Sequence, residues 1–255
     1  MDRIYRIGQG TGGRYAVERG GRMYWMRGEV FGEYDIGDAL ADAQPRVWMA
    51  PVSPSIVVCI GLNYKDHAAE MNKKLPEEPL IFMKPASSVI GPEEEIRLPE
   101  WAGRIEHEAE MALVIKRRAF RVKAAQAMDY VLGLTCLNDV TARELQAKDG
   151  QYARAKGFDT FAPIGPCIAV GLDPSALAVE GHVNTQLRHQ SNTRELIFPV
   201  PYLVEYVTRF MTLNPGDIIT TGTPSGVGPL RPGDRVTVSV EGVGTLGNPC
   251  VQLTA

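Results

Sequence analysis

Short apolar stretches separated by turns rich in glycine and proline run through most of this chain, a pattern typical of strand-rich folds. Near the N-terminus, the alternating segments RIYRIG, RYAVER and RMYWMRG predict three short strands of a small β unit. The stretch from residue 35 to about residue 54 is rich in alanine and proline, and we expect it to be a linker. Farther on, the continuous apolar runs SIVVCIG and CIAVGL predict buried strands.

Helical patterns are fewer. In VPYLVEYVTRFMTL, apolar residues at positions 203, 207 and 210 share one helical face and predict an amphipathic helix. Thr141, followed three residues later by Glu144, matches a capping box and predicts that a helix begins there. Asn63 has the character of a helix start for YKDHAAEM. Two PGD turns precede the predicted strands DIITTG and DRVTVSV, so the chain as a whole is predicted to be a strand-rich α+β protein.

The alternation is strictest between residues 106 and 115. A period of two predicts a strand that carries Glu106, Glu108 and Glu110 on one face. The opposite face is apolar and is expected to point into the core; it consists of Ala109, Met111, Leu113 and Ile115.

A second apolar strand, from Tyr130 to Leu137, is followed directly by Asn138 and Asp139. The stacked glutamates repel one another unless a cation or water lies among them. An aspartate at a strand end beside such glutamates would add a third oxygen ligand of the kind that Mg²⁺ or Mn²⁺ prefers. From these residues alone, a metal site and an exposed face of solvated glutamates are equally good interpretations.

Composition and charge set further limits. A chain of 255 residues can bury a full core, either as one domain or as a large domain with a small appendage. Its net charge of -3, without a long run of one sign, argues against nucleic-acid binding. No apolar stretch reaches the roughly 18 residues of a membrane-spanning helix, and the start resembles no secretory signal. We therefore expect a cytoplasmic protein without membrane partners, and its four widely spaced cysteines are expected to be free, buried thiols.

Residues 8–13, GQGTGG, match the dinucleotide-binding pattern G-x-G-x-x-G. That motif functions only where it opens a helix, whose N-terminus holds the pyrophosphate. Here the strand-like RYAVER follows, so a hairpin turn is the better interpretation.

His67 and Glu70 are three residues apart on a predicted helix, so their side chains would meet. A carboxylate beside a histidine fixes the tautomer and raises the basicity, as in a general base. Spacing alone, however, favours a solvated pair without chemistry. Lys84 lies in the apolar run LIFMKPASSVIG and either reaches the surface or points into a site. The other histidines, His107, His182 and His189, have no metal-ligand spacing and are expected at the surface.

Several longer pieces, in one order between Ser55 and Val251, resemble the fumarylacetoacetate hydrolase family. They are GLNYKDHAAE, FMKPASSVIGP, HEAEMALVI, LNDVTARELQ, AKGFDTFAPIGP, LIFPVPYLVEYV, LNPGDIITTGTPSGVG and EGVGTL. The resemblance implies a catalytic domain over residues 55–255, built as a mixed β-roll around one divalent metal ion. It also implies a small N-terminal β domain with its linker over residues 1–54.

The resemblance assigns roles residue by residue. The family's metal ligands correspond here to Glu108, Glu110 and Asp139. Its catalytic residues correspond to His67, Glu70, Arg143, Gln146 and Lys156. Its substrate-binding residues correspond to Lys84, Gly222, Thr223 and Pro224. These matches favour the catalytic interpretation of the histidine–glutamate pair over the solvated one.

Family substrates are 2-oxo acids or their enols, so the resemblance implies a small-molecule 2-oxo acid as substrate, Mg²⁺ (or Mn²⁺ or Ca²⁺) as cofactor, and a homodimer. Bound to such a site, a divalent ion acts as a Lewis acid. The segment LRHQSNTRELIF favours an activity like that of 2-hydroxyhepta-2,4-diene-1,7-dioate isomerase or 5-oxopent-3-ene-1,2,5-tricarboxylate decarboxylase, in the catabolism of aromatic compounds. The alternatives are hydrolysis of the carbon–carbon bond of an acylpyruvate, such as fumarylpyruvate, and decarboxylation of oxaloacetate. A non-catalytic protein that binds 2-oxo acids is the remaining hypothesis.

Overall fold

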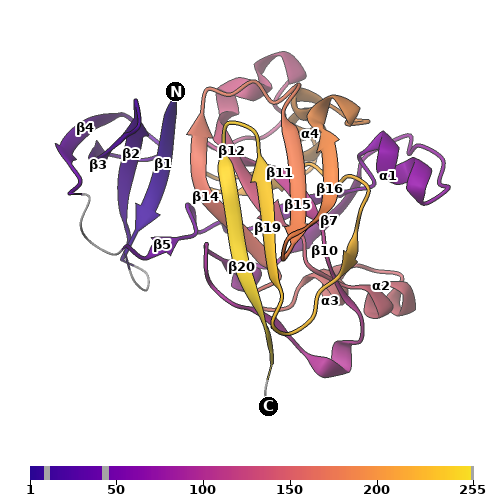
Figure 1. Cartoon of the computed structure of the whole chain (residues 1–255). Coiled ribbons are helices and arrows are strands. Elements are labelled where there is room, and N and C mark those ends of the chain that lie inside the picture. The colour runs from indigo at the N-terminus through magenta and orange to yellow at the C-terminus, as the bar shows by residue number, and fades with distance from the viewer. Residues whose placement is uncertain (9–11, 42–45, 254–255) are drawn as a thin grey trace.

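The computed structural model describes residues 1–8, 12–41 and 46–253. Strands dominate this part of the chain, and only four short α-helices accompany them. The strands form three sheets, and the five-stranded sheet packs against the middle of the largest one (Figure 1). The predicted strand-rich α+β class is confirmed.

The largest sheet has twelve strands in the order β4-β3-β2-β1-β14-β12-β11-β17-β6-β7, with β5 beside β1 and β8 beside β14. Most pairs are antiparallel, whereas β6–β17 and β8–β14 are parallel. Its strands are β1 (Asp2–Ile7), β2 (Arg14–Arg19), β3 (Arg22–Gly28), β4 (Tyr34–Ala39), β5 (Trp48–Met49), β6 (Val57–Gly61), β7 (Leu80–Lys84), β8 (Val89–Ile90), β11 (Ala109–Ile115), β12 (Val131–Asn138), β14 (Ala162–Val170) and β17 (Ile218–Thr220).

Two smaller sheets complete the strand structure. The five-stranded sheet, in the order β16-β15-β19-β20-β9, consists of β9 (Ile96–Leu98), β15 (Ala178–Val183), β16 (Gln186–Asn192), β19 (Arg235–Val240) and β20 (Gly244–Gln252). The three-stranded sheet, in the order β13-β10-β18, consists of β10 (Ile105–His107), β13 (Thr141–Ala142) and β18 (Gly228–Pro229). The α-helices are α1 (Lys65–Glu70), α2 (Arg143–Asp149), α3 (Ala153–Lys156) and α4 (Val200–Thr208). The 3₁₀ helices are η1 (Ala86–Ser88), η2 (Glu100–Ala102), η3 (Ala124–Tyr130) and η4 (Thr193–Glu195).

Strand β11 shows how the sheets enclose the core. Met111 and Leu113 belong to the cluster between the two larger sheets, which also contains Val238 of β19. Val114 faces the other side of the large sheet and belongs to a second cluster with Ile168 of β14. The predicted core face of β11 is confirmed, and the opposite face is buried as well. Burial of each such aliphatic side chain stabilises the fold by about 1.5–3 kcal/mol.

The N-terminal strands extend the large sheet. β1 pairs with β2 on one side and with β14 on the other, where Ile4 lies opposite Ile168 (left side of Figure 1). The antiparallel pairing of β1 with β2 is the arrangement that a hairpin turn produces, although residues 9–11 of the predicted turn lie outside the described residues. The domain boundary near residue 54 stays a prediction.

The prediction of a linker from residue 35 onward is wrong for its first part. Residues 34–39 form β4, which pairs with β3, and β5 pairs with β1. Backbone hydrogen bonds to an available strand edge do not depend on strongly strand-forming side chains, so the composition of this stretch was misleading. Residues 42–45 lie outside the described residues.

The capping box predicted from Thr141 and Glu144 is also wrong. α2 begins at Arg143, and Thr141 belongs to β13, where its hydroxyl donates to the carbonyl of Asp139 (2.9 Å). The carboxylate of Glu144 accepts instead from the amide of Arg104 (3.3 Å). Pairing of β13 with β10 therefore takes the threonine into the sheet before the helix begins.

Other local predictions are confirmed or refined. The amphipathic helix is α4, and each PGD turn precedes a strand, β17 or β19. The segment that ends at Lys156 includes the short helix α3. All four cysteines are free and buried, as predicted. No helix in the described part of the chain combines the length and apolar character needed to cross a membrane.

Candidate active site

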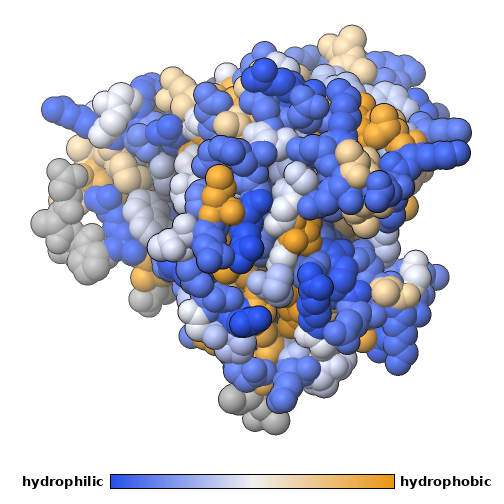
Figure 2. All heavy atoms as spheres, turned by 45° about the vertical axis from the view of Figure 1, so that its right-hand side comes forward, coloured by the Kyte–Doolittle hydropathy of each residue, from blue (hydrophilic) through white to orange (hydrophobic). Residues whose placement is uncertain are grey.

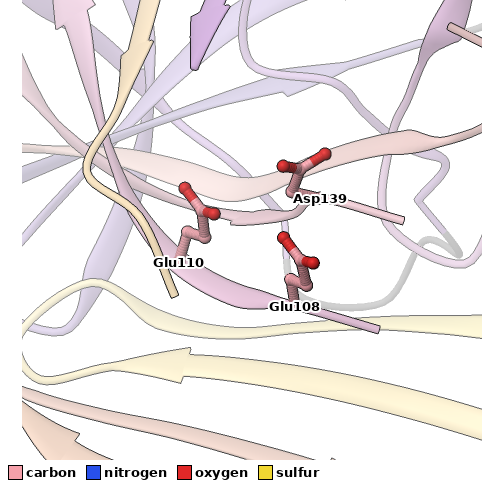
Figure 3. A group of neighbouring side chains, drawn as sticks. All are labelled: Glu108, Glu110 and Asp139. Atoms are coloured by element: carbon pink, nitrogen blue, oxygen red, sulfur yellow. The ribbon is translucent and has the colours of Figure 1, made fainter. Parts of the chain in front are cut away.

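Three carboxylates meet where β11 begins and β12 ends. One oxygen from each of Glu108, Glu110 and Asp139 lies within 4.8 Å of the others (Figure 3). The three residues are only 7%, 1% and 0% exposed. Burial of three acidic side chains at this distance is unfavourable unless positive charge compensates them. The interpretation of an exposed, solvated face is therefore wrong.

Glu108 lies in the gap between β10 and β11, so the single strand predicted over residues 106–115 is broken at this residue. The side chain of Asn138 accepts a hydrogen bond from the Glu108 amide (3.0 Å), and the Asp139 amide donates to the Glu108 carbonyl (2.9 Å). These bonds attach the end of β12 to the gap. The break separates Glu106 from Glu108 and Glu110. Glu106 lies in the three-stranded sheet and forms an ion pair with Arg143 instead of belonging to the carboxylate cluster.

Three cations surround two of the carboxylates. Lys84 donates to Asp139 (2.5 Å), and Lys156 donates to both Glu108 (2.8 Å) and Asp139 (2.6 Å). Arg143 donates to the other oxygen of Glu108 (2.6 Å). Both lysines are almost fully buried, so Lys84 points into the site and does not reach the surface.

Glu110 is the carboxylate without such a partner. Its side chain accepts from the amide of Gly222 (2.9 Å), and no lysine or arginine in the described residues forms an ion pair with it. Burial, followed by the charges of Asp139 and Glu108, raises its pKa well above the usual value. At Glu108, burial also acts to raise the pKa, but Lys156 and Arg143 outweigh it and lower the pKa. Negative charge is thus undercompensated at Glu110.

This donor set fits a divalent cation. Three converging carboxylates supply only oxygen ligands, which are the ligands of hard ions such as Mg²⁺, Mn²⁺ and Ca²⁺. A dication between them would also supply the positive charge that is missing beside Glu110. The residues that would hold it are Glu108, Glu110 and Asp139.

A tight turn beside the carboxylates requires glycine. Gly222 has a φ of 90°, and a Cβ there would lie 2.9 Å from the Cβ of Asn63. This conformation aims its amide at Glu110. Thr223 follows with its hydroxyl on a β11 carbonyl (3.1 Å), and Pro224 is buried next to it. The role of these residues in binding a substrate carboxylate stays a prediction.

The histidine–glutamate pair lies on α1. Nδ1 of His67 lies 3.0 Å from a carboxylate oxygen of Glu70, as the three-residue spacing predicts. The other oxygen of Glu70 accepts from the amide of Gly226 (3.2 Å), on the turn that follows Gly222. The pair is therefore bound to the same loop that contacts the carboxylate cluster.

These elements border a cavity of about 110 Å³. Its polar lining includes His67, Lys73, Gln146 and Tyr152 together with two of the three carboxylates, Glu108 and Glu110, and its apolar wall includes Phe82. A larger cavity, of about 770 Å³, lies by β5 and shares no lining residue with this one. Figure 2 brings forward the side with α1, α2 and α3, which is mostly hydrophilic with small, separate hydrophobic groups. A cavity lined by several charged side chains is suited to a charged small molecule.

Comparisons with known proteins agree on one family. The family model described as fumarylacetoacetate (FAA) hydrolase, C-terminal, matches residues 56–251. The chain belongs to the fumarylacetoacetate hydrolase family. A crystal structure described as 2-hydroxyhepta-2,4-diene-1,7-dioate isomerase from Mycobacterium marinum has a TM-score of 0.91 and 40% identity, with 100% of both chains covered.

Curated relatives are also similar along most of the chain. A protein of Archaeoglobus fulgidus is 48% identical over 242 residues, which are 94% of this chain and 96% of that protein. The mitochondrial oxaloacetate tautomerase fahd2 of Xenopus laevis is 41% identical over 216 residues, 80% of this chain and 68% of that protein. As a member of the fumarylacetoacetate hydrolase family, this protein is an enzyme, and its carboxylate cluster lies inside the matched range.

One feature of this family member was missed in the sequence. His107 and His189 are 1% and 0% exposed, so the prediction that they lie at the surface is wrong. Nδ1 of His107 lies 3.0 Å from Nε2 of His189, and burial lowers the pKa of both, to about 3 for His107. The two residues are 82 positions apart, and no local pattern in the sequence indicates that they meet.

Proposed function

We propose that this enzyme is a divalent-metal-dependent isomerase of 2-oxo dicarboxylic acids, which interconverts their 2-hydroxydiene (enol) and 2-oxo forms. The observation that carries the proposal is a cavity lined by His67, Glu108 and Glu110. Asp139 completes the cluster of buried carboxylates, and Glu70 contacts His67. The names of two similar proteins, a 2-hydroxyhepta-2,4-diene-1,7-dioate isomerase and an oxaloacetate tautomerase, support the same type of reaction.

The chemistry is divided between the carboxylate cluster and the histidine–glutamate pair. A divalent ion bound by the three carboxylates would supply a Lewis acid for the 2-oxo group. Lys156 and Arg143 hold Glu108 in place and contribute positive charge beside a substrate carboxylate. The side-chain oxygen of Gln146 accepts a hydrogen bond from another nitrogen of the Arg143 guanidinium (2.6 Å), and this contact helps to fix the orientation of that group.

Proton transfer falls to His67. With its Nδ1–H donated to Glu70, the Nε2 atom is the one that takes up a proton and returns it. In the isomerisation, the proton leaves the enol oxygen and is delivered to a carbon conjugated with it, so substrate and product have the same composition. A single base that both accepts and returns a proton is sufficient.

Lys73 is suited to bind a second carboxylate of the substrate. It lines the cavity from the turn after α1, and it forms no ion pair with a carboxylate in the part of the chain that the structure describes. Lys84, Lys156 and Arg143 are already paired with the site's own carboxylates. The free cation at the mouth favours dicarboxylates over monocarboxylates.

Hydrolysis of an acylpyruvate is the second candidate, because His67 with Glu70 could equally activate water. Decarboxylation of oxaloacetate uses the same carboxylate-binding groups. We favour isomerisation because two similar proteins are named as an isomerase and a tautomerase.

An assay of the Mg²⁺ form in D₂O tests the proposal. We expect 2-hydroxyhepta-2,4-diene-1,7-dioate and enol oxaloacetate to be converted to their oxo forms with deuterium on carbon, faster than any acylpyruvate is cleaved. NMR identifies each product, and chelator followed by Mg²⁺, Mn²⁺ or Ca²⁺ identifies the metal. Faster cleavage would establish the hydrolase, and no turnover of any 2-oxo acid would leave only the non-catalytic binder.

Replacing Lys73 by methionine should lower kcat/KM for a dicarboxylate about fivefold, because an exposed ion pair contributes up to about 1 kcal/mol. A monocarboxylate of equal chain length should be unaffected. Lys74→Met is the matched control, since Lys74 is the next residue and does not line the cavity. Equal losses for both substrates would exclude this role of Lys73.

A further inference from the structure

The buried histidines form a directed hydrogen-bonded chain. Nδ1 of His189 lies 2.8 Å from the carbonyl oxygen of Ser225, and because a carbonyl only accepts, this nitrogen carries the proton. Nε2 of His189 is then an acceptor for Nδ1–H of His107. Nε2 of His107 is buried and has no hydrogen-bond partner among the described residues.

This series of hydrogen bonds ends at Ser225, next to the residues that contact the histidine–glutamate pair. Ser225 and Gly226 are consecutive, and the amide of Gly226 donates to the carboxylate of Glu70 (3.2 Å). The other oxygen of Glu70 faces Nδ1 of His67. The turn held by His189 therefore holds Glu70, and Glu70 holds the ring of His67.

Strand β16 is attached to α1 at a second point. Ser191, two residues after His189, donates to the carboxylate of Asp66 (2.6 Å), the residue before His67. The backbone of β16 also packs closely on the turn, since a Cβ on Gly226 would lie 1.9 Å from the carbonyl oxygen of Arg188. β16 thus supports both the helix that carries the base and the turn that orients it.

Packing alone does not account for two imidazoles at this place. Burial of a polar group is unfavourable, and an apolar side chain of similar size would fill the same space without that penalty. A hydrogen bond from His189 to one specific carbonyl, by contrast, fixes the orientation of the turn.

We propose that His189, supported by His107, is a positioning residue that orients the His67–Glu70 pair through the Ser225–Gly226 turn. The inference rests on the proposed role of His67 as the group that transfers the proton. His189 itself belongs neither to the carboxylate cluster nor to the residues that line the cavity.

Leucine and asparagine at position 189 provide a matched test, because they have nearly the same shape. Asparagine keeps an N–H donor near the position of Nδ1, whereas leucine has none. We expect His189→Leu to lower kcat about 10- to 100-fold, the range that a small misplacement of a catalytic group produces, and His189→Asn to retain most of the activity. Equal losses in the two variants would overturn the proposal.

A double-mutant cycle tests whether the effect passes through Glu70. In a Glu70→Ala background, His189→Leu should reduce kcat by less than twofold, because the contact through which it acts is already lost. The same fold-loss in both backgrounds would show that position 189 acts only on the stability of the fold. His182→Leu, on neighbouring β15, is the control for loss of a histidine from this sheet.

Two measurements need no turnover and so separate this proposal from the proposed function. Hydrogen exchange should be faster over residues 65–70 and 225–226 in His189→Leu than in His189→Asn, with unchanged exchange in β12. In the wild-type protein, ¹⁵N NMR should find His189 protonated on Nδ1. Protonation on Nε2 alone, or equal exchange in the two variants, would overturn the positioning role even if the enzyme is an isomerase.

Discussion

Replacement of Glu110 by glutamine should abolish both metal binding and turnover while the protein remains folded. Glutamine keeps an oxygen to accept from the amide of Gly222 but removes the charge needed to bind a dication. Glu108 and Asp139 would remain, with their charges largely compensated by Lys84, Lys156 and Arg143. Glu110 is a cleaner target than Glu108, whose removal would leave buried cations unpaired.

The same replacement should raise the stability of the metal-free protein at neutral pH. The pKa of Glu110 is raised in the folded state. Above a pH of about 4.3, the ordinary pKa, the unfolded chain therefore releases this proton more readily than the folded protein does, and this lowers the free energy of unfolding. Glutamine removes this effect.

Calorimetry and thermal unfolding with and without Mg²⁺ check both statements. The free energy of unfolding of the wild type should rise by about 2.7 kcal/mol at a metal concentration 100 times Kd, and that of the variant should not change. Glu106→Gln, which alters a neighbouring buried glutamate outside the cluster, should retain the metal-dependent gain. Full activity of Glu110→Gln in the presence of chelator would refute the metal site.

Replacement of His67 by alanine should separate the possible reactions. Loss of a general base typically reduces a rate by about 10²–10⁴-fold, so hydrolysis of an acylpyruvate, which requires activated water, should fall by that range. Decarboxylation of oxaloacetate needs no activated water and should be affected least. Isomerisation should lie between the two, because water can partly replace His67 in delivering the proton.

Rates of all three reactions at saturating Mg²⁺, for the wild type and the variant, provide the measurement. His182→Ala, a half-buried histidine on β15, is the control and should leave each rate unchanged. An equal loss in all three reactions would mean that His67 positions the substrate or the helix instead of transferring a proton.

The sequence alone determined the local structure wherever its pattern was strong. The alternation after Glu108 specified β11 and its core face, and the helical period specified α4. The three-residue spacing of His67 and Glu70 was sufficient to place their side chains in contact, because neighbours on a helix meet whatever surrounds them. The motifs from Ser55 to Val251 identified the family, and through it the carboxylates that the structure brings together.

Where local patterns were weak, neighbouring strands decided the outcome. Thr141 has the character of a helix cap, yet pairing of β13 with β10 takes it into a sheet. Residues 34–39 have the composition of a linker, yet the edge of β3 makes them a strand. The capping and turn preferences of single residues contribute about 1 kcal/mol to the free energy of folding. The several hydrogen bonds of a sheet together contribute more.

Only the tertiary structure determined how the charges and the histidines are partnered. Lys84 and Asp139 are 55 positions apart, and Glu70 and Gly226 are 156 apart. Contacts of this kind arise when sheets pack and loops meet, and the residue types alone contain no periodic signal for them. The sequence therefore named the carboxylates of the site, while the fold decided which of them, Glu110, lacks a cation and which histidines, His107 and His189, support the loop beside His67 and Glu70.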